Sequence, residues 1–356
     1  MSLTTAPVFG TMPREDLASS DPSHTYMTKA VSTALSVGYR QFDLAEIYST
    51  QAAVGQAFAT AFADSVVKRD NLFLISKLDG LPGSTSQSQD YASTKQRVQN
   101  MLKEVNVDYF DLLLIHFPLA SGTGNDVLTG DPSSISTSEN WTLYVESLAV
   151  AWEHMSRLRQ DGLVKHVGLS NCYLQHLEAF STLLRTEAGS SVQSSELAPI
   201  YAIQNFIDAA HPESELLEFC KENQCHCLAY RPVVFIPVYG LLDGMADLMQ
   251  SEATARGLNT LHELVLYWLM TKTVSPVVSS VTKAHIVSNY SVGLKFQQER
   301  DMKESQSVDE DLKSVLSSMN DVMRRIAGES ETVDMMGGVD EYALAFKAMM
   351  GTTTDN

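Results

Sequence analysis

The chain has 356 residues, of which 44% are hydrophobic, and a formal net charge of −18 at pH 7. This length and composition allow one large buried core, and α/β barrels often reach this length as a single domain. So acidic a chain repels phosphate backbones and anionic lipid surfaces, which argues against nucleic-acid and membrane partners. No run approaches the roughly 20 apolar residues that span a bilayer, and residues 1–7 lack the features of a signal peptide, so we expect a cytoplasmic protein.

Short apolar runs, typical of buried β-strands, alternate along the chain with segments of helical periodicity. The runs lie near Val8 and at Gln41–Asp43, Leu72–Lys77, Asp111–His116, His166–Asn171, Tyr201–Asn205, His226–Tyr230 and Ser275–Ser279. The helical segments are Tyr26–Val37, Ala52–Ala63, Ser93–Val105, Leu148–Gln160, Leu174–Arg185, Glu213–Asn223 and Leu261–Met270. Eight strands alternating with helices predict an α/β fold, a parallel eight-stranded (β/α)8 TIM barrel, rather than an open sheet.

Two segments interrupt the alternation. Residues 119–143, rich in Ser, Gly, Thr and Asp, predict a long polar loop after the fourth strand, which we expect to border the substrate. From about residue 297 a C-terminal extension begins with the charged stretch Gln297–Ser305 and continues with a helix at Asp309–Ile326. We interpret residues 1–330 as the barrel unit and 331–356 as a tail.

The cysteines Cys172, Cys220, Cys225 and Cys227 are too few and too clustered for a disulfide framework. The run Cys225-His226-Cys227 has the residue types of a metal site. Alternation along a strand would send His226 to the face opposite both thiols, so we expect no metal.

Four polar residues stand at or just beyond the carboxyl ends of strands, where the active sites of (β/α)8 barrels lie: Asp43, Tyr48, Lys77 and His116. A tyrosine, a lysine, an aspartate and a histidine brought to the same end of neighbouring strands make a proton-donating site. Tyr48 is the candidate proton donor, and an ammonium at Lys77, held by Asp43, would lower the pKa of the phenol. His116 would complete a pair of hydrogen-bond donors. Taken singly, these residues are more often structural; their combination favours catalysis.

Several ordered motifs carry a resemblance to a known family. They are Gly38-Tyr39-Arg40-Gln41-Phe42-Asp43 with Tyr48, Ile75-Ser76-Lys77, Leu114-Ile115-His116, Gly168-Leu169-Ser170-Asn171, Gln204-Asn205, Ala229-Tyr230-Arg231-Pro232 and Ser279-Ser280-Val281-Thr282. Together they resemble the aldo-keto reductase family over roughly residues 8 to 320. The resemblance implies that Asp43, Tyr48, Lys77 and His116 are the catalytic tetrad.

The resemblance also implies reduction of a carbonyl, in which His116 would orient the carbonyl oxygen. The hydride for this reaction must come from a cofactor, because no side chain donates one. The chain lacks the G-x-G-x-x-G fingerprint, and the Gly-Thr-Gly at 122–124 lies in the polar loop. The resemblance implies NADP(H) more than NAD(H). By position, Ser170, Asn171 and Gln204 would hold the carboxamide, and Tyr230 would stack on the nicotinamide ring.

The chain departs from the family pattern after the eighth strand, where a lysine and an arginine typically grip the 2′-phosphate of NADP. Ser279 and His285 stand in their places. The neighbouring positions agree with the pattern: Ser280, Val281, Thr282 and Asn289. Lys283 and Arg231 are the candidate replacements for the missing cations, Arg231 standing where the family often has serine.

The substrate side departs as well. Phe117 stands where the family has tryptophan, and residues 78–80, Leu-Asp-Gly, replace another aromatic position. We expect Phe117 and Trp141 to line a remodelled substrate pocket.

These observations predict an NAD(P)(H)-dependent oxidoreductase that acts on a small carbonyl or alcohol, as a monomer or small homo-oligomer. Two alternatives stay open: a subunit of the same fold that binds NADP(H) as a redox sensor for a partner, and a relic without cofactor.

Overall fold

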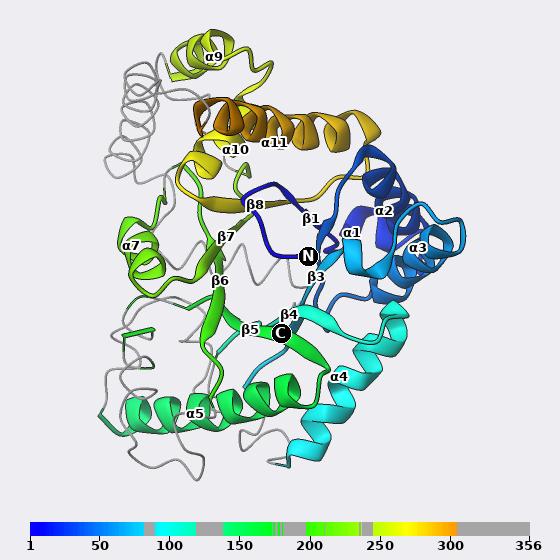
Figure 1. Ribbon diagram of the computed structural model, residues 1–356, viewed down its shortest axis with the longest axis vertical. Helices are drawn as coiled ribbons and strands as arrows, with labels where there is room; N and C mark the ends of the chain where they lie inside the picture. The colour runs from blue at the N-terminus through cyan, green and yellow to red at the C-terminus, as the bar shows by residue number, and fades with distance from the viewer. Residues whose placement is uncertain are drawn as a thin grey trace, which may run out of the picture.

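The computed structural model describes residues 1–81, 90–118, 138–172, 174, 177–178, 180, 197–209, 211–234, 236 and 245–304, without the side chains of 138–146, 245 and 302–304. Its strands form a closed parallel barrel in sequence order, with the last strand pairing back to the first (Figure 1). The strands are β1 Val8–Gly10, β2 Gln41–Asp43, β3 Phe73–Leu78, β4 Phe110–Ile115, β5 Val164–Ser170, β6 Ile200–Phe206, β7 His226–Tyr230 and β8 Val274–Val278. The predicted (β/α)8 barrel is confirmed.

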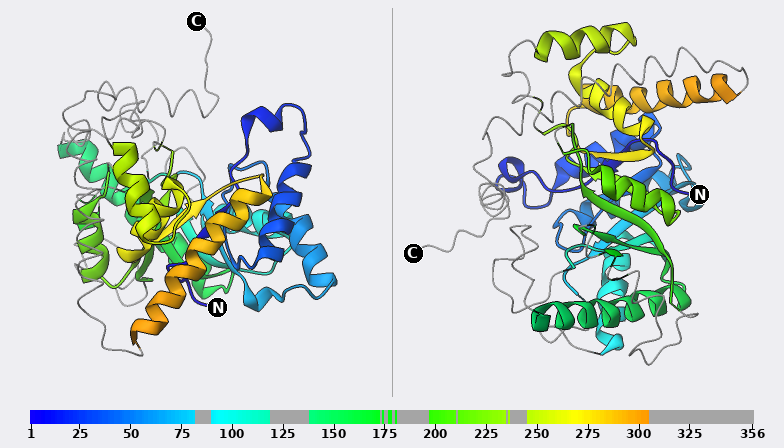
Figure 2. Two further views of the ribbon diagram at one scale, coloured as in Figure 1. Left: turned by 90° about the horizontal axis from the view of Figure 1, so that it is seen from above. Right: turned by 90° about the vertical axis from the view of Figure 1, so that its left-hand side faces the viewer.

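Helices surround the strands as an outer layer (Figure 1, Figure 2). They are α1 Glu15–Ala18, α2 Thr25–Val37, α3 Gln51–Ala63, α4 Tyr91–Val105, α5 Ser138–Gln160, α7 Ser214–Glu222, α9 Met245–Ala255, α10 Leu261–Thr271 and α11 Lys283–Glu304. Local signals set several ends. Asp90 caps α4 by accepting a hydrogen bond from Ala92 N, and Asn106 ends that helix in the left-handed conformation, as asparagine often does.

Five sequence predictions need correction or fall outside the described residues. The polar loop predicted at 119–143 is too long, because 138–143 are already helical in α5; residues 119–137 are not described. The charged stretch predicted at Gln297–Ser305 is, up to Glu304, the end of α11. The predicted helix at 309–326, the tail 331–356 and most of the helix at 174–185 lie outside the described residues.

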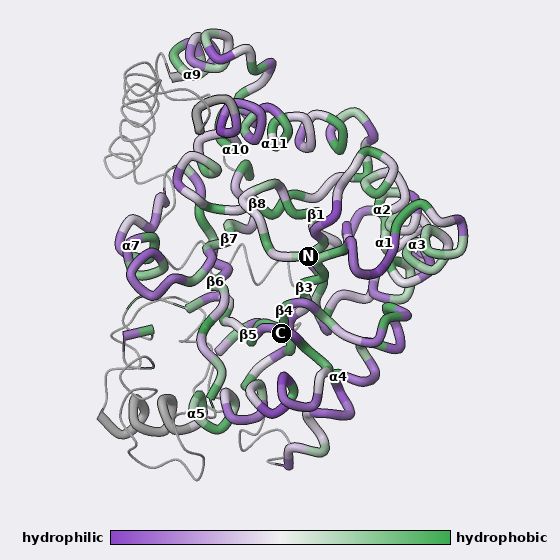
Figure 3. Tube along the Cα trace, viewed as in Figure 1, coloured by the Kyte–Doolittle hydropathy of each residue, from purple (hydrophilic) through white to green (hydrophobic). Residues whose placement is uncertain are grey.

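The core has two parts. Figure 3 shows green, hydrophobic stretches along the strands of the barrel. One part lies between the barrel and the helices, and the other fills the barrel interior with inward-facing side chains such as Phe73, Ile75, Leu112 and Leu114. Because side chains alternate along a strand, the same inward faces of β3 and β4 continue to Lys77 and then His116. The apolar rows therefore end in polar groups at one end of the barrel.

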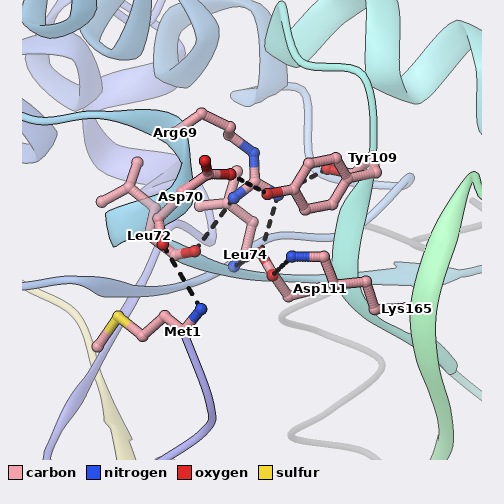
Figure 4. Close-up of polar contacts among 8 residues, drawn as sticks. All are labelled: Met1, Arg69, Asp70, Leu72, Leu74, Tyr109, Asp111 and Lys165. Atoms are coloured by element: carbon pink, nitrogen blue, oxygen red, sulfur yellow. Dashed lines mark hydrogen bonds and ion pairs between the residues drawn. The ribbon is translucent and has the colours of Figure 1, made fainter.

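The opposite, amino-terminal end is closed by polar contacts and by the first residues of the chain. Asp111, fully buried, accepts hydrogen bonds from Arg69 (2.8 Å), Lys165 (3.1 Å) and Leu74 N (3.0 Å) (Figure 4). The cations of Arg69 and Lys165 also lie 3.9 and 4.1 Å from the centre of the Tyr109 ring. This network neutralises the buried carboxylate at the end of the barrel opposite Lys77 and His116.

The N-terminal segment covers the same end. Leu3 packs against the inner barrel cluster, and the backbone of Thr4 bonds both Gln41 of β2 (2.7 Å) and Ser275 of β8 (2.9 Å). Gln41 also donates to Ala6 O at 3.0 Å. Within the described residues, no helix is long and apolar enough to cross a membrane.

Candidate active site

The sequence-predicted tetrad gathers at the carboxyl end of the barrel. Asp43 ends β2, Lys77 lies near the end of β3, and His116 directly follows β4. Tyr48 stands in the turn between β2 and α3, where its N–H donates to Ala45 O at 3.0 Å. Three of the four side chains extend inward-facing rows, so strand alternation and a short turn suffice to bring the tetrad together.

Asp43 and Lys77 form a buried ion pair. Lys77 Nζ donates to Asp43 Oδ2 at 2.5 Å and to Leu44 O at 2.9 Å, and the two side chains are only 1% and 4% exposed. The second carboxylate oxygen, Oδ1, accepts a hydrogen bond from Gln204 Nε2 at 2.9 Å. Burial lowers the pKa of Lys77, while the adjacent Asp43 carboxylate opposes that shift. The pair thus joins β2, β3 and β6 with its charges matched.

Tyr48 and His116 complete the cluster. Their rings meet edge to face with centroids 5.9 Å apart, and Lys77 Nζ lies 5.2 Å from the centre of the Tyr48 ring. Tyr48 is half-buried and His116 is buried. A phenol and an imidazole therefore face the same space beside a buried ammonium, which is the arrangement that donation to a carbonyl oxygen requires.

Burial sets the acidity of both groups. Burial and then the Asp43 carboxylate raise the pKa of the Tyr48 phenol, and the Arg231 guanidinium opposes them. We expected Lys77 to lower the pKa of Tyr48 below its ordinary value, and for the protein without bound cofactor this expectation is wrong. The Asp43 carboxylate balances the charge of Lys77, so the desolvation of the phenolate decides the direction of the shift. Burial and the charge of Lys77 hold the pKa of His116 well below 6.5, so its imidazole is neutral near pH 7.

The position of His116 is fixed by its backbone and by a neighbouring ring. Its N–H donates to Leu78 O (2.9 Å), its carbonyl accepts from Asn171 Nδ2 (2.9 Å), and its ring stacks on Phe117 with centroids 4.3 Å apart. Among the described residues, its buried Nδ1 has no hydrogen-bond partner. Phe117 thus lies beside the tetrad, whereas the side chain of Trp141, a residue of α5, is not described.

The residues expected at the nicotinamide lie together on the neighbouring strands. Ser170 Oγ donates to Gln204 O at 2.7 Å, and Tyr230 OH donates to Asn171 Oδ1 at 2.7 Å. Asn171 adopts a left-handed backbone (φ 55°), which turns its amide between Tyr230 and the carbonyl of His116. The ends of β5, β6 and β7 therefore form one wall of amide and hydroxyl groups beside the tetrad.

The remaining predicted cofactor residues lie around the same end. Arg231, half-buried with φ 53°, directs Nη2 towards Met12 Sδ, 4.0 Å away, in the segment after β1. Ser279 to Thr282 connect β8 to α11, where the Ser280 hydroxyl accepts from Thr282 N at 3.1 Å. The residues of this segment and of the first turns of α11 divide by exposure: Ser279, Thr282 and His285 are exposed, and Ser280, Val281 and Asn289 are half-buried.

Sequence reasoning missed Met12 and His262. Met12 directly follows Thr11, whose N–H and hydroxyl both bond Asp43 O (3.0 and 2.9 Å), and its place just after β1 was the signal that could have found it. Burial lowers the pKa of His262, in the first turn of α10, and the charge of His285 adds to that shift. No sequence pattern links these two histidines, which belong to different helices.

The residues present fit a nicotinamide dinucleotide. Among the described residues, the buried His116 Nδ1 has no hydrogen-bond partner. Leaving such a buried nitrogen unpaired costs about 1–3 kcal/mol of folding free energy, so a bound polar group would stabilise it. Arg231 has no carboxylate partner among the described side chains, which suits an anionic group. No group of His, Cys, Asp or Glu side chains in the described part of the chain is placed to hold a metal ion.

Comparisons with known proteins agree with this geometry. The model of the aldo/keto reductase family matches residues 8–310. Aldose reductase B of Dictyostelium discoideum is 28% identical over 275 residues, covering 74% of this chain and 78% of that protein. Aldo-keto reductase family 1 member C18 of Rattus norvegicus is 30% identical over 202 residues, so the match spans 57% of this chain and just over half, 56%, of that relative.

Among solved structures, a Bombyx mori aldo-keto reductase in complex with NADP superposes with a TM-score of 0.62 at 22% identity, covering 89% of this chain and 88% of that one. This likeness shows the fold. The family match extends over all eight strands and over each member of the tetrad. The chain therefore belongs to the aldo/keto reductase family of oxidoreductases.

Proposed function

We propose that this protein reduces an aldehyde or ketone to the alcohol, or oxidises the alcohol in reverse, with NADP(H) as cofactor and Tyr48 as general acid. The observation that carries the proposal is the buried Asp43–Lys77 pair beside Tyr48 and a neutral His116. A purely structural ion pair needs neither a phenol nor an unpartnered imidazole nitrogen next to it.

In the forward direction the bound dinucleotide supplies a hydride to the carbonyl carbon. Tyr48 OH donates a hydrogen bond to the carbonyl oxygen and then transfers its proton as that oxygen becomes an alkoxide. His116, neutral, donates a second hydrogen bond and orients the carbonyl. Lys77, 5.2 Å from the phenol ring centre, and Arg231 offset the negative charge that Tyr48 acquires.

A raised pKa does not disqualify Tyr48 as the proton donor. An alkoxide is about as basic as hydroxide, so it is a stronger base than a phenolate, even one whose phenol has a raised pKa. Proton transfer from a buried phenol to an alkoxide is therefore still favourable. The raised pKa instead keeps Tyr48 protonated across the neutral range, so the donor is present before the substrate binds.

For the cofactor, we propose that Ser170, Asn171 and Gln204 hold the carboxamide and that Tyr230 stacks on the nicotinamide ring. A charge-assisted contact to phosphate contributes on the order of 1.5–3 kcal/mol. Because Ser279 is uncharged, NADPH and NADH affinities should lie within about two orders of magnitude of each other. Ser279→Lys should widen this gap towards NADPH; no change would mean that another cation already fills the site.

The test is NAD(P)H consumption with a panel of reactive aldehydes, comparing wild type with Tyr48→Phe. Loss of a general acid typically removes a factor of about 10²–10⁴, here in kcat rather than in cofactor affinity. Tyr39→Phe is the matched control, because it removes a buried phenol oxygen that has no hydrogen-bond partner among the described residues. The Tyr39 ring packs on Phe9 and Tyr290, away from the tetrad. Full activity in Tyr48→Phe would disprove the mechanism.

A second candidate function is an NADP(H)-binding redox sensor of the same fold. The raised pKa of Tyr48 favours it, because a phenol that stays protonated is a poor general base, so catalysis in the direction of alcohol oxidation would be weak. If wild type binds NADPH tightly but turns over none of the aldehydes, this function replaces the catalytic one.

A further inference from the structure

The turn between β2 and α3 places the Tyr48 hydroxyl, which has no hydrogen-bond partner among the described residues. The phenol ring meets His116 edge to face and lies near the ammonium of Lys77, but no described side chain anchors its oxygen. A reacting group without such an anchor depends on the residues that support its backbone. The attachments of this turn therefore decide where the proton is offered to a substrate.

Glu46, two residues before Tyr48, ties one side of the turn to β3. Its N–H donates to Lys77 O at 2.9 Å, which extends the pairing of β2 with β3 beyond Asp43. Its carboxylate accepts from Asp79 N at 3.0 Å, just after the end of β3. Both the backbone and the side chain of Glu46 thus hold the turn against the strand that carries Lys77.

Arg97 of α4 completes this attachment. Its Nε donates to Glu46 Oε1 at 2.8 Å and its Nη2 donates to Oε2, so the two side chains form a bidentate pair. The same Nη2 also donates to Asp79 O at 2.8 Å. One guanidinium therefore joins the turn after β2, the segment after β3 and α4. A planar fork of this kind holds a carboxylate in one orientation, whereas a lysine ammonium acts as a point charge.

The charges of this corner depend on Arg97. Each side chain of the Glu46–Arg97 pair is 23% exposed, so the pair is partly shielded from water. Burial raises the pKa of the Asp79 carboxyl, the Glu46 carboxylate adds to that shift, and the charge of Arg97 opposes it. Without Arg97 the two acids would repel one another, and Glu46 would move away from Asp79 N.

The other side of the turn is held separately. Thr50 Oγ1 donates to Thr11 O at 2.7 Å, a buried contact with the segment after β1. Ile47, the residue between Glu46 and Tyr48, is exposed, so apolar packing of its side chain does not hold the turn. The polar contacts of Glu46 are thus the attachment on the β3 side.

Resting on the proposed function, we propose that Glu46 and Arg97 are positioning residues for the reaction. They hold the turn of Tyr48 against the strand of Lys77 and so place the phenol at the carbonyl oxygen. They act through Tyr48 and form no part of the amide and hydroxyl wall at β5 to β7. Their loss should therefore lower kcat and leave cofactor affinity unchanged, since misplacing a reacting group by about 1 Å can cost about 10²-fold in rate.

The first test compares wild type with Arg97→Gln, Glu46→Gln and Arg97→Lys. Turnover of a reactive aldehyde at saturating NADPH gives kcat, fluorescence titration gives NADPH affinity, and urea unfolding gives stability. We expect kcat to fall by about tenfold to a hundredfold in Arg97→Gln and Glu46→Gln, with NADPH affinity changed by less than about twofold. Arg97→Lys keeps the charge without the fork and should recover only part of the loss.

A second test separates positioning of Tyr48 from general damage to the site. In a Tyr48→Phe background the group to be positioned is absent, so adding Arg97→Gln should lower the remaining rate by less than about twofold. A change that disturbs the whole site would instead lower the rate by the same factor in both backgrounds. Combining Glu46→Gln with Arg97→Gln should cost no more than the larger single loss, because both remove one contact.

Arg256→Gln is the matched control. Arg256 pairs with Glu252 at 2.8 Å, the two side chains are 8% and 19% exposed, and their helix, α9, lies away from α3 and α4 (Figure 1). This variant should lower the urea midpoint and keep the wild-type kcat. An unchanged kcat in Arg97→Gln, or an equal loss in the wild-type and Tyr48→Phe backgrounds, overturns the inference and leaves the proposed function intact. A wild type that turns over no aldehyde overturns both.

Discussion

Replacing Lys77 by methionine tests whether the buried pair is both structural and catalytic. Lys77 and Asp43 are 1% and 4% exposed and joined at 2.5 Å. In Lys77→Met the carboxylate keeps only the hydrogen bond from Gln204 Nε2 and loses its counter-charge. Leaving one member of a buried pair uncompensated costs about 3–5 kcal/mol. At a denaturant dependence of about 3 kcal/mol per molar urea, the unfolding midpoint should fall by about 1–1.7 M.

The double variant Asp43→Asn with Lys77→Met separates the two roles. The amide oxygen introduced at position 43 can still accept from Gln204, and no buried charge remains. An unpaired neutral group costs about 1–3 kcal/mol, so the double variant should be more stable than Lys77→Met alone. Its activity should stay as low, because no ammonium remains to offset charge on Tyr48.

Urea unfolding followed by circular dichroism, together with NADPH consumption, measures both effects at pH 7. A loss below about 1 kcal/mol in Lys77→Met would refute the assignment of a buried, charged pair. Recovery of stability and full activity in the double variant would show that the pair serves the fold alone.

Three further outcomes are expected. Because burial and Lys77 hold the pKa of His116 well below 6.5, kcat at saturating cofactor should show no inflection near pH 6.5; an inflection that disappears in His116→Gln would contradict this. The hydrogen bond to Asp208 raises the pKa of His211 in the folded protein. The stability that this histidine contributes is therefore complete below its pKa in the unfolded chain and is lost as pH rises through its pKa in the folded protein. In urea unfolding, His211→Gln should lower the free energy of unfolding more at about pH 5.5 than at about pH 8.5. Asp111→Asn should lower stability by about 1.5–3 kcal/mol by weakening its bonds to two cations, with kcat unchanged because Asp111 lies at the far end of the barrel; a changed kcat would show that the two ends are coupled.

Much of the barrel could be predicted, because each strand has a recognisable pattern in its own short stretch of sequence. The runs ending in Asp43, Lys77 and His116 are apolar, short and bounded by turn residues, and a closed parallel barrel places their ends together. Gly168 illustrates the same link between motif and packing. A Cβ at that position would lie 2.7 Å from Leu114 Cδ2 and collide with the carbonyl of Ala202, so β5 requires glycine where it approaches its neighbours.

Contacts between distant segments could not be predicted from the sequence. The bond from Gln204 to Asp43 joins residues 161 positions apart, and the bond from Ser288 to Glu263 joins two helices whose faces show no shared pattern. The pKa of Tyr48 also depends on such contacts, because its direction is set by how far the folded chain excludes water from the phenol.

The first residues of the chain cover the amino-terminal end of the barrel, and this has a consequence for how the protein folds during synthesis. Thr4 accepts a hydrogen bond from Ser275, 271 positions later, and β1 pairs with β8. During synthesis the chain emerges N-terminus first. Neither the contact of Thr4 with Ser275 nor the pairing of β1 with β8 can form until β8 has left the ribosome. Until then β1 and β7 present open edges that can pair with other chains. Contacts of such long sequence separation also slow folding. We therefore expect the nascent chain to depend on chaperones until β8 is complete.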